Sequence, residues 1–294
     1  MAKHERFSGR SVVISGAASG IGAETARLFA SEGAIVFAAD IDDDAGAALV
    51  EDWAEKGEGD GEIRYRHCDV CDPAQIAALI DGAAQECGGI DILFNNAGAG
   101  GAREPIDEID AAGWDRTMDL LLRSVAMGIR FAVPHMIGRK HANIVNVSSV
   151  AAIGPGYAPT AYAVAKAGVL HLTRCAATDL ARHGIRVNAV QPGFINTNIF
   201  TAGLDVPEQM KRTAKAMIAQ MSADAQPVAR GGQSRDIAEA VAYLASPAAE
   251  FVTGQSIVVD GGLTLGPRHS WDPETPGLFD SLKAMAEQAG AKMA

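Results

Sequence analysis

The sequence has no apolar run approaching the roughly 18 residues that a membrane-spanning helix needs. Its first segment, Met1–Gly9, is short and polar, whereas a secretory signal would place an apolar stretch there. We therefore expect no association with a membrane and a cytoplasmic location.

Basic residues are too few to balance the acidic ones, with 25 Lys and Arg against 36 Asp and Glu and a net charge of −11. A surface of this sign repels phosphate backbones, so nucleic acid is not an expected partner.

Cysteine is scarce, with four in 294 residues. Cys68 and Cys71 have the spacing of half a zinc site or of a redox pair, but no second Cys-x-x-Cys and no paired histidines complete it. We expect ordinary thiols in a reducing compartment and no metal site.

Short apolar runs alternate with helical patterns along the chain, and 48% of the residues are hydrophobic. The expected strands are Val12–Ile14, Ile35–Ala39, Arg64–Cys68, Ile90–Phe94, Ile144–Val147, Val187–Val190 and Ile257–Val259. The expected helices are Ile21–Ser31, Ala45–Lys56, Pro73–Cys87, Ala112–Phe131, Ala161–Arg182 and Arg235–Leu244. This alternation predicts an α/β fold with a mostly parallel seven-stranded sheet and helices on both faces.

A glycine-rich turn joins the first expected strand to the first helix. It reads Ser15-Gly16-Ala17-Ala18-Ser19-Gly20-Ile21-Gly22. Glycines let a backbone approach a pyrophosphate closely, and a helix N-terminus offers unpaired N–H groups and a positive dipole end. The turn therefore predicts dinucleotide binding, although glycines also serve ordinary turns.

Asp40 ends the second expected strand, 18 positions after Gly22, and Ile41 follows it. A carboxylate there can accept hydrogen bonds from the adenosine ribose and repels a 2′-phosphate. This favours NAD(H) over NADP(H). The alternative is a helix cap or surface acid, because three more aspartates follow at 42–44.

Polar side chains also follow the third and fourth expected strands. Asp69-Val70 and Asn95-Asn96-Ala97-Gly98 fall where ligands bind in open α/β sheets. Asp69 can bond an adenine amino group. Asn95 can support the neighbouring backbone, the cofactor, or both.

Tyr162 and Lys166 lie four apart in an Ala-rich segment that is predicted to be helical, so they share a helix face. A nearby ammonium lowers the pKa of a phenol, which makes it a better base. Ser149 lies thirteen positions before Tyr162, just after an apolar strand. The two hydroxyls suit proton transfer at one substrate oxygen, and the alternative is a chance pair on a helix face.

Taken together, these motifs resemble the classical short-chain dehydrogenase/reductase family from about Gly9 to Leu265. The resemblance implies a single Rossmann-type doubly wound domain. It also implies Tyr162 as general acid/base, Lys166 as its partner and as a ligand of the nicotinamide ribose, and Ser149 as a ligand of the substrate oxygen. It further assigns the nicotinamide end of the cofactor to the segment Pro192-Gly193-Phe194-Ile195-Asn196-Thr197, chiefly Ile195 and Thr197. A plain strand exit would explain Pro192 and Gly193 equally well.

Leu121 departs from the family pattern, because the family usually carries a catalytic Asn at this position. In the family that Asn helps to hold a water that links the lysine to solvent, and leucine cannot form hydrogen bonds. Ser124 is a candidate substitute.

The last part of the chain departs from simple alternation. A stripe of Met210, Ala214, Met217, Ile218 and Met221 has helical spacing, which indicates either core packing or, by the resemblance, a substrate lid over residues 197–232. We expect residues 1–265 to form the domain and residues 266–294 to form a C-terminal extension.

We predict an NAD(H)-dependent oxidoreductase that interconverts a bulky, largely apolar secondary alcohol and a ketone. The resemblance also implies a homotetramer or homodimer. One alternative is a non-catalytic dinucleotide-binding sensor or scaffold, which Leu121 favours. Another is enoyl reduction, although enzymes of that kind usually space Tyr and Lys differently.

Overall fold

One parallel sheet forms the centre of the computed structural model, which describes residues 5–197, 199 and 207–288. Among these residues its strand order is β3-β2-β1-β4-β5-β6-β7, and every neighbouring pair is parallel. The strands are β1 Ser11–Ser15, β2 Ile35–Asp40, β3 Glu62–His67, β4 Ile92–Asn95, β5 Asn143–Val147, β6 Arg186–Pro192 and β7 Ser256–Val259.

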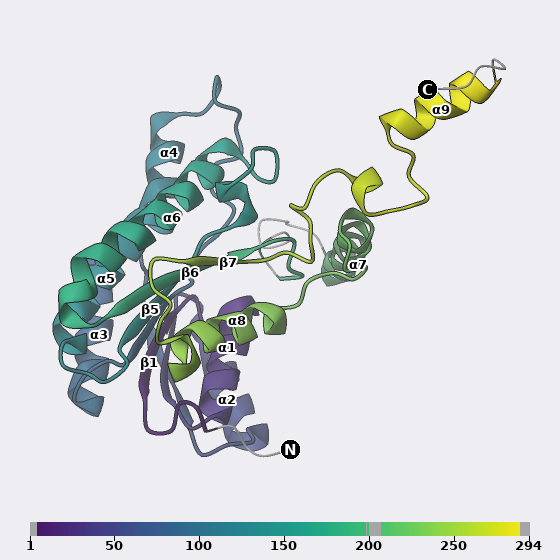
Figure 1. Cartoon of the computed structure of the whole chain (residues 1–294). Helices are drawn as coiled ribbons and strands as arrows, with labels where there is room; N and C mark the ends of the chain where they lie inside the picture. Colours follow the sequence, from purple (N-terminus) through teal and green to yellow (C-terminus); the bar gives the residue numbers. More distant parts are fainter. Residues whose placement is uncertain (1–4, 198, 200–206, 289–294) are drawn as a thin grey trace.

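Helices cover both faces of the sheet (Figure 1). One face carries α1 Gly20–Ser31, α2 Asp43–Lys56 and α8 Ser234–Ala245. The other carries α3 Pro73–Cys87, α4 Ala111–Met118, α5 Ser124–Met136 and α6 Thr160–Leu180. Each face has its own hydrophobic cluster, as expected for parallel strands that are buried on both sides. The predicted seven-stranded, doubly wound α/β fold is confirmed, and the described sheet is wholly parallel.

The predicted single helix Ala112–Phe131 is wrong in its detail. A π-helical turn, Asp119–Arg123, separates α4 from α5, and helical structure continues to Met136. The Ser124 hydroxyl donates to the Leu120 carbonyl at 2.5 Å beside this wider turn. Such local departures in hydrogen bonding leave no trace in an apolar periodicity, and π turns often occur at functional sites.

Near the end of the described chain lies α9, Leu278–Gln288, none of whose residues is buried. Figure 1 shows α9 away from the sheet, beyond α7 Glu208–Ala225. Within the described residues, no helix combines the length and the apolar character that crossing a membrane requires.

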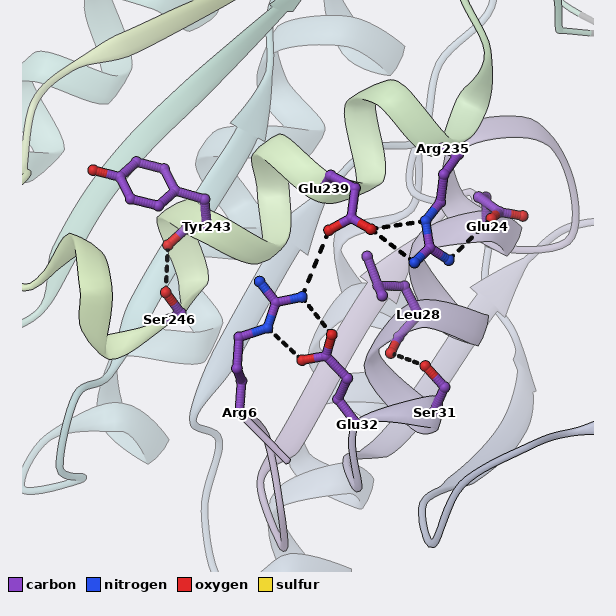
Figure 2. Close-up of polar contacts among 9 residues, drawn as sticks. All are labelled: Arg6, Glu24, Leu28, Ser31, Glu32, Arg235, Glu239, Tyr243 and Ser246. Carbon is purple, nitrogen blue, oxygen red and sulfur yellow. Dashed lines mark hydrogen bonds and ion pairs between the residues drawn. The ribbon is translucent and has the colours of Figure 1, made fainter. Parts of the chain in front are cut away.

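A chain of ion pairs ties the N-terminal segment to α1 and α8 (Figure 2). Arg6 forms a bidentate pair with Glu32, whose side chain is only 8% exposed, and lies 3.6 Å from Glu239. Arg235 joins Glu239 to Glu24 at the other end. The hydrogen bonds that Arg6 donates to Glu32 are the main reason that the pKa of Arg6 is raised.

Replacing Arg6 with Ala should destabilise the fold, because it leaves the Glu32 carboxylate buried without its partner. We expect a loss of about 1–3 kcal/mol in the free energy of unfolding, measured by urea denaturation. The control is Arg27→Ala, which removes an exposed pair with Asp52 and should cost less than about 1 kcal/mol. Equal losses in the two variants would contradict this account.

Candidate active site

The polar residues predicted from the sequence gather at the carboxyl edge of the sheet, because all described strands run in the same direction. Ser15, Asp40, Asn95 and Pro192 each end a strand there, and Ser149 follows β5 by two residues. Open α/β sheets bind ligands at this edge.

The glycine-rich turn packs directly against the chain that leaves β4. The Asn96 side-chain amide donates to the carbonyls of Ser15 and Gly16 at 3.0 and 2.8 Å. The Ser15 hydroxyl accepts from the backbone N–H groups of Asn96 and Ala97 at 3.1 and 3.2 Å. A Cβ on Gly16, where φ is +65°, would lie 2.6 Å from Cα of Ala97, so only glycine fits.

Gly22 is equally constrained, since a Cβ there would lie 2.1 Å from the carbonyl oxygen of Gly16. Because Gly16 and Gly22 carry no side chains, the backbone of the turn Ser15–Gly22 is accessible at the start of α1, and we name this turn the cradle. Ser19 precedes the helix without a side-chain capping bond, whereas aspartates cap α2, α3 and α4. The first N–H groups of α1 thus remain available to an anion.

Asp40 lies beside this cradle with its carboxylate held by backbone donors. Oδ2 accepts from Ala18 N at 3.0 Å, and Oδ1 accepts from Ile41 N at 2.8 Å and from Asp42 N at 3.2 Å. Asp42, not Asp40, caps α2 through a bond from Ala45 N. The alternative that Asp40 serves as the cap is therefore wrong.

At the exit of β3, Asp69 Oδ1 accepts from Cys71 N at 2.8 Å, and the backbone N–H of Asp69 donates to Gln75. Val70 lines a small cavity together with Asn95 and Ala97. The structure thus brings Val70 close to the chain that leaves β4.

The nearby thiols show no sign of redox or metal chemistry. Cys68 is buried, and burial raises its pKa to about 11, while burial also raises the pKa of Cys71. A reactive thiol needs the opposite shift. No group of His, Cys, Asp and Glu within the described ranges could hold a metal ion.

The segment after β6 that is predicted to hold the nicotinamide is bonded to the chain just before α8. Ile195 forms a parallel bridge with Gly232, and Asn196 N donates to the Gly232 carbonyl at 2.8 Å. Thr197 lies against the cradle, because a Cβ on Gly20 would sit 3.3 Å from its Cγ2. Segments almost 180 residues apart in the sequence therefore meet at one place.

Ser149 and Tyr162 come together across the β5–α6 connection. The Ser149 hydroxyl lies close enough to the Tyr162 phenol to act on its pKa, and the Ser149 oxygen accepts from Ala151 N at 3.1 Å. Gln191 supports this position from β6 by donating to the Ser149 carbonyl at 3.3 Å. The two hydroxyls can therefore meet a single substrate oxygen.

Lys166 lies beside them in the interior, where it is only 3% exposed. Its Nζ donates to the Val147 carbonyl at 2.9 Å and lies 5.7 Å from the centre of the Tyr162 ring. Burial lowers the pKa of Lys166 to about 8. The neighbouring Ser148 donates its hydroxyl to the Lys166 carbonyl at 2.8 Å.

Lys166 is expected to lower the pKa of the Tyr162 phenol, whereas the net effect of the surroundings in this structure is to raise it. Burial raises the pKa of Tyr162, and the nearby Ser149 hydroxyl opposes that rise. The ammonium is directed to the Val147 carbonyl, so it does not offset the loss of solvation. The phenol therefore stays protonated, which is the form that gives a proton to a ketone oxygen.

Leu121 occupies the centre of the π-helical turn and is fully buried. A Cβ on Gly98 would lie 3.1 Å from Leu121 Cδ2 and 3.8 Å from Lys166 Nζ, so a methyl group sits near the ammonium. Ser124 does not replace the missing amide, since its proton goes to the Leu120 carbonyl and it lines the cavity beneath Asn95.

Asn146 is a supporting residue that the sequence reasoning missed. Its side chain accepts from Asn95 Nδ2 at 2.9 Å and donates to Thr173 at 3.0 Å, which links β4, β5 and α6 in the interior. This buried pairing favours the structural interpretation of Asn95. The signal was present, because an Asn stands inside the apolar run Ile144–Val147.

The methionine stripe of α7 does not pack into the core. Met210, Met217 and Met221 are 57%, 62% and 65% exposed. Of the predicted lid, residues 198 and 200–206 lie outside the described residues.

Comparisons with known proteins agree with this geometry. The family model described as enoyl-(acyl carrier protein) reductase matches residues 16–264. A cis-4-hydroxycyclohexanecarboxylate dehydrogenase from Sinomonas cyclohexanicum is 42% identical over 264 residues, covering 88% of this chain and 98% of that protein. The 3-oxoacyl-(acyl-carrier-protein) reductase FabG from Thermotoga maritima is 38% identical over 262 residues, covering 88% and 100%.

A solved structure shows the same likeness in three dimensions. The short-chain type dehydrogenase/reductase from Mycobacterium ulcerans superposes with a TM-score of 0.79 at 31% identity. The match covers 91% of this chain and 95% of that one.

The buried Lys166 should make stability depend on pH. An unfolded lysine keeps its proton to about pH 10.5, whereas the folded one loses it near pH 8, so in between the unfolded state binds more protons and stability rises with pH. Relative to Lys166→Met, the unfolding free energy of the wild type should gain about 2 kcal/mol from pH 7 to about pH 9.5. Urea denaturation of the cofactor-free proteins measures this, and a difference that stays flat with pH would show that the amine is solvated.

Proposed function

Because the chain belongs to the classical short-chain dehydrogenase/reductase family, we propose that it is an NAD(H)-dependent oxidoreductase that interconverts a secondary alcohol and a ketone. The observation that carries the proposal is that Ser149 and Tyr162 lie together beside the buried Lys166, at the sheet edge that also holds the glycine cradle.

The family implies a nicotinamide dinucleotide, and the residues present fit one. Gly16 and Gly22 have no room for a side chain, and the start of α1 lacks a side-chain cap. When bound, such a cofactor would accept a hydride from an alcohol carbon or return it to a ketone. The segments around Asp40, Asp69 and Asn96–Gly98 would hold its adenosine and diphosphate, and Pro192, Gly193, Ile195 and Thr197 its nicotinamide.

The chain's own groups would move the proton. In ketone reduction, the Tyr162 hydroxyl gives its proton to the carbonyl oxygen, and the Ser149 hydroxyl donates a hydrogen bond to the same oxygen as charge develops there. In alcohol oxidation the proton travels the other way. Lys166 supplies positive charge beside the phenolate that forms and a ligand for the ribose.

NAD(H) rather than NADP(H) is proposed because Asp40 presents a carboxylate at the end of β2, held by backbone donors beside the cradle. A 2′-phosphate at this place would meet Asp40 and the aspartates that follow it.

The substrate is proposed to be a bulky, largely apolar alcohol, with a ring as the first choice. The exposed methionines of α7 offer an apolar surface of the kind that a lid would present to a substrate. The relative from Sinomonas is named for a cyclic secondary alcohol. The FabG relative acts on an acyl-carrier-protein substrate, which makes a chain-like ketone the competing class.

We also propose that the protein works in the cytoplasm as a homodimer or homotetramer. The catalytic unit would span residues 1–265, and residues 266–294 would form an appended segment. The exposed apolar side chains of α9, among them Leu278 and Phe279, suit a contact that a single copy does not provide.

A non-catalytic dinucleotide sensor is the second candidate, and Leu121 is the observation that favours it. A buried methyl group lies near Lys166 where the family usually carries an amide. One assay separates the candidates: reduction of NAD and of NADP over a panel of cyclic, aromatic, steroid and acyclic secondary alcohols. Turnover supports the enzyme, whereas NADH binding without turnover of any alcohol or matching ketone supports the sensor.

Replacing Tyr162 with Phe removes only the proposed proton donor and should lower kcat by at least about 100-fold. The Kd for NADH, followed by cofactor fluorescence, should change by less than about threefold, because the ring and Lys166 remain. Val164→Ala, at an exposed position of the same helix, is the control and should keep wild-type kcat. Normal turnover in Tyr162→Phe would refute the role.

A further inference from the structure

The edge strand β3 carries two side chains that reach the loop after β2. Tyr65 pairs with Ala38 and His67 pairs with Asp40 in the parallel ladder. Because strand residues alternate between faces, Tyr65 and His67 point to the same side of the sheet. That side carries α2 and the segment Asp40–Asp44, which we name the acidic turn.

Both side chains bind the acidic turn at the same atom. The Tyr65 hydroxyl lies 2.8 Å from Asp43 Oδ1 and 2.9 Å from the Asp40 carbonyl. His67 Nδ1 lies 2.9 Å from Asp43 Oδ1. Since a carboxylate only accepts, Nδ1 carries the proton in this contact.

The Tyr65 ring is itself fixed under α2. A Cβ on Gly46 would lie 2.1 Å from its Cε2 atom, so the helix backbone rests on the ring. Burial and the Asp43 carboxylate both raise the pKa of Tyr65, so its hydroxyl keeps its proton. The hydrogen bonds from Tyr65 and His67 lower the pKa of Asp43, so it stays ionised.

The other end of the acidic turn is held by the glycine-rich turn, through the bond from Ala18 N to Asp40 Oδ2. The turn therefore has two anchors, one in the phosphate cradle and one on the edge strand. The second anchor contains no residue that is expected to touch a bound cofactor.

We propose that Tyr65 and His67 are positioning residues for cofactor selectivity: through Asp43 they hold the acidic turn where Asp40 meets the adenosine ribose. This rests on the proposed preference for NAD(H). A ligand with a 2′-phosphate needs the turn to move outward, and the anchor on β3 opposes that movement. A ribose hydroxyl binds best to a carboxylate that is held in one position, and the anchor on β3 holds the Asp40 carboxylate in that position.

A competing explanation needs no anchor. The four carboxylates of the acidic turn repel a 2′-phosphate by charge alone, wherever the turn lies. The two explanations predict different effects of substitutions at Asp43 and Asp44, which are neighbours with the same charge and are both exposed. Asp43 accepts the bonds from β3, and the structure gives Asp44 no such contact.

The test measures dissociation constants for NADH and NADPH by cofactor fluorescence in Tyr65→Phe, which keeps the ring and removes the hydroxyl. Loss of this hydrogen bond should raise the Kd for NADH about three- to tenfold. The Kd for NADPH should stay level or fall. The ratio of the Kd for NADPH to the Kd for NADH should therefore fall by at least the same factor. The kcat at saturating NADH should stay within about twofold.

Asp43→Ala and Asp44→Ala form the matched pair, since each removes one charge from the same helical turn. The anchor predicts a smaller NADPH-to-NADH ratio in Asp43→Ala and little change in Asp44→Ala. Equal changes in these two, with none in Tyr65→Phe, would overturn the proposal in favour of net charge. A parallel loss of both affinities with a lowered melting temperature in Tyr65→Phe would also overturn it, as a purely structural role.

His67 gives an independent check at an exposed position, where substitution does not endanger folding. His67→Ala removes a donor to Asp43 and should lower the NADPH-to-NADH ratio of dissociation constants, as Tyr65→Phe does. His67→Asn keeps an N–H donor and should have the wild-type ratio. The wild-type ratio tests the proposed NAD(H) preference separately. A wild type that binds NADPH as tightly as NADH would refute the preference, while the change in NADH affinity in the variants would still decide whether the anchor exists.

Discussion

The close contact between the glycine-rich turn and the exit of β4 is the constraint on which the site depends. Gly16 and Ala97 approach so closely that no side chain fits, and Asn96 and Ser15 fasten the two backbones with four hydrogen bonds. This contact leaves the start of α1 bare and sets where a diphosphate can lie. The groups proposed to act on substrate and cofactor are arranged around it because all described strands end at the same edge.

Burial works in opposite directions on the two groups that are proposed to handle the proton. It raises the pKa of Tyr162 and lowers the pKa of Lys166, so both side chains favour their neutral forms more than they would in water. Ser149 moderates the first effect, and the Val147 carbonyl holds the amine in place. Leu121 adds apolar surface near the amine where the family usually has an amide, so the local balance of charge differs from the usual family arrangement.

Much of the fold followed from patterns that are local in the sequence. Alternating apolar runs and helical periods predicted the seven strands and most of the helices, because a parallel strand buried on both faces needs a continuous apolar run. The π-helical turn was missed, since one extra residue in a turn does not interrupt the apolar pattern of Ala112–Phe131. The methionines of α7 were ambiguous for a related reason: spacing identifies a face, but not whether anything covers it.

By itself the sequence determined the order of elements, the glycine-rich turn and the four-residue spacing of Tyr162 and Lys166, because these depend on neighbours along the chain. Only the tertiary structure decided that Ser149 lies beside Tyr162, that Lys166 is buried and turned to Val147, and that Tyr65 and His67 hold Asp43. Those contacts join segments that are distant in sequence or separated by irregular chain, and the degree of burial that sets each pKa is a property of all the surrounding elements together.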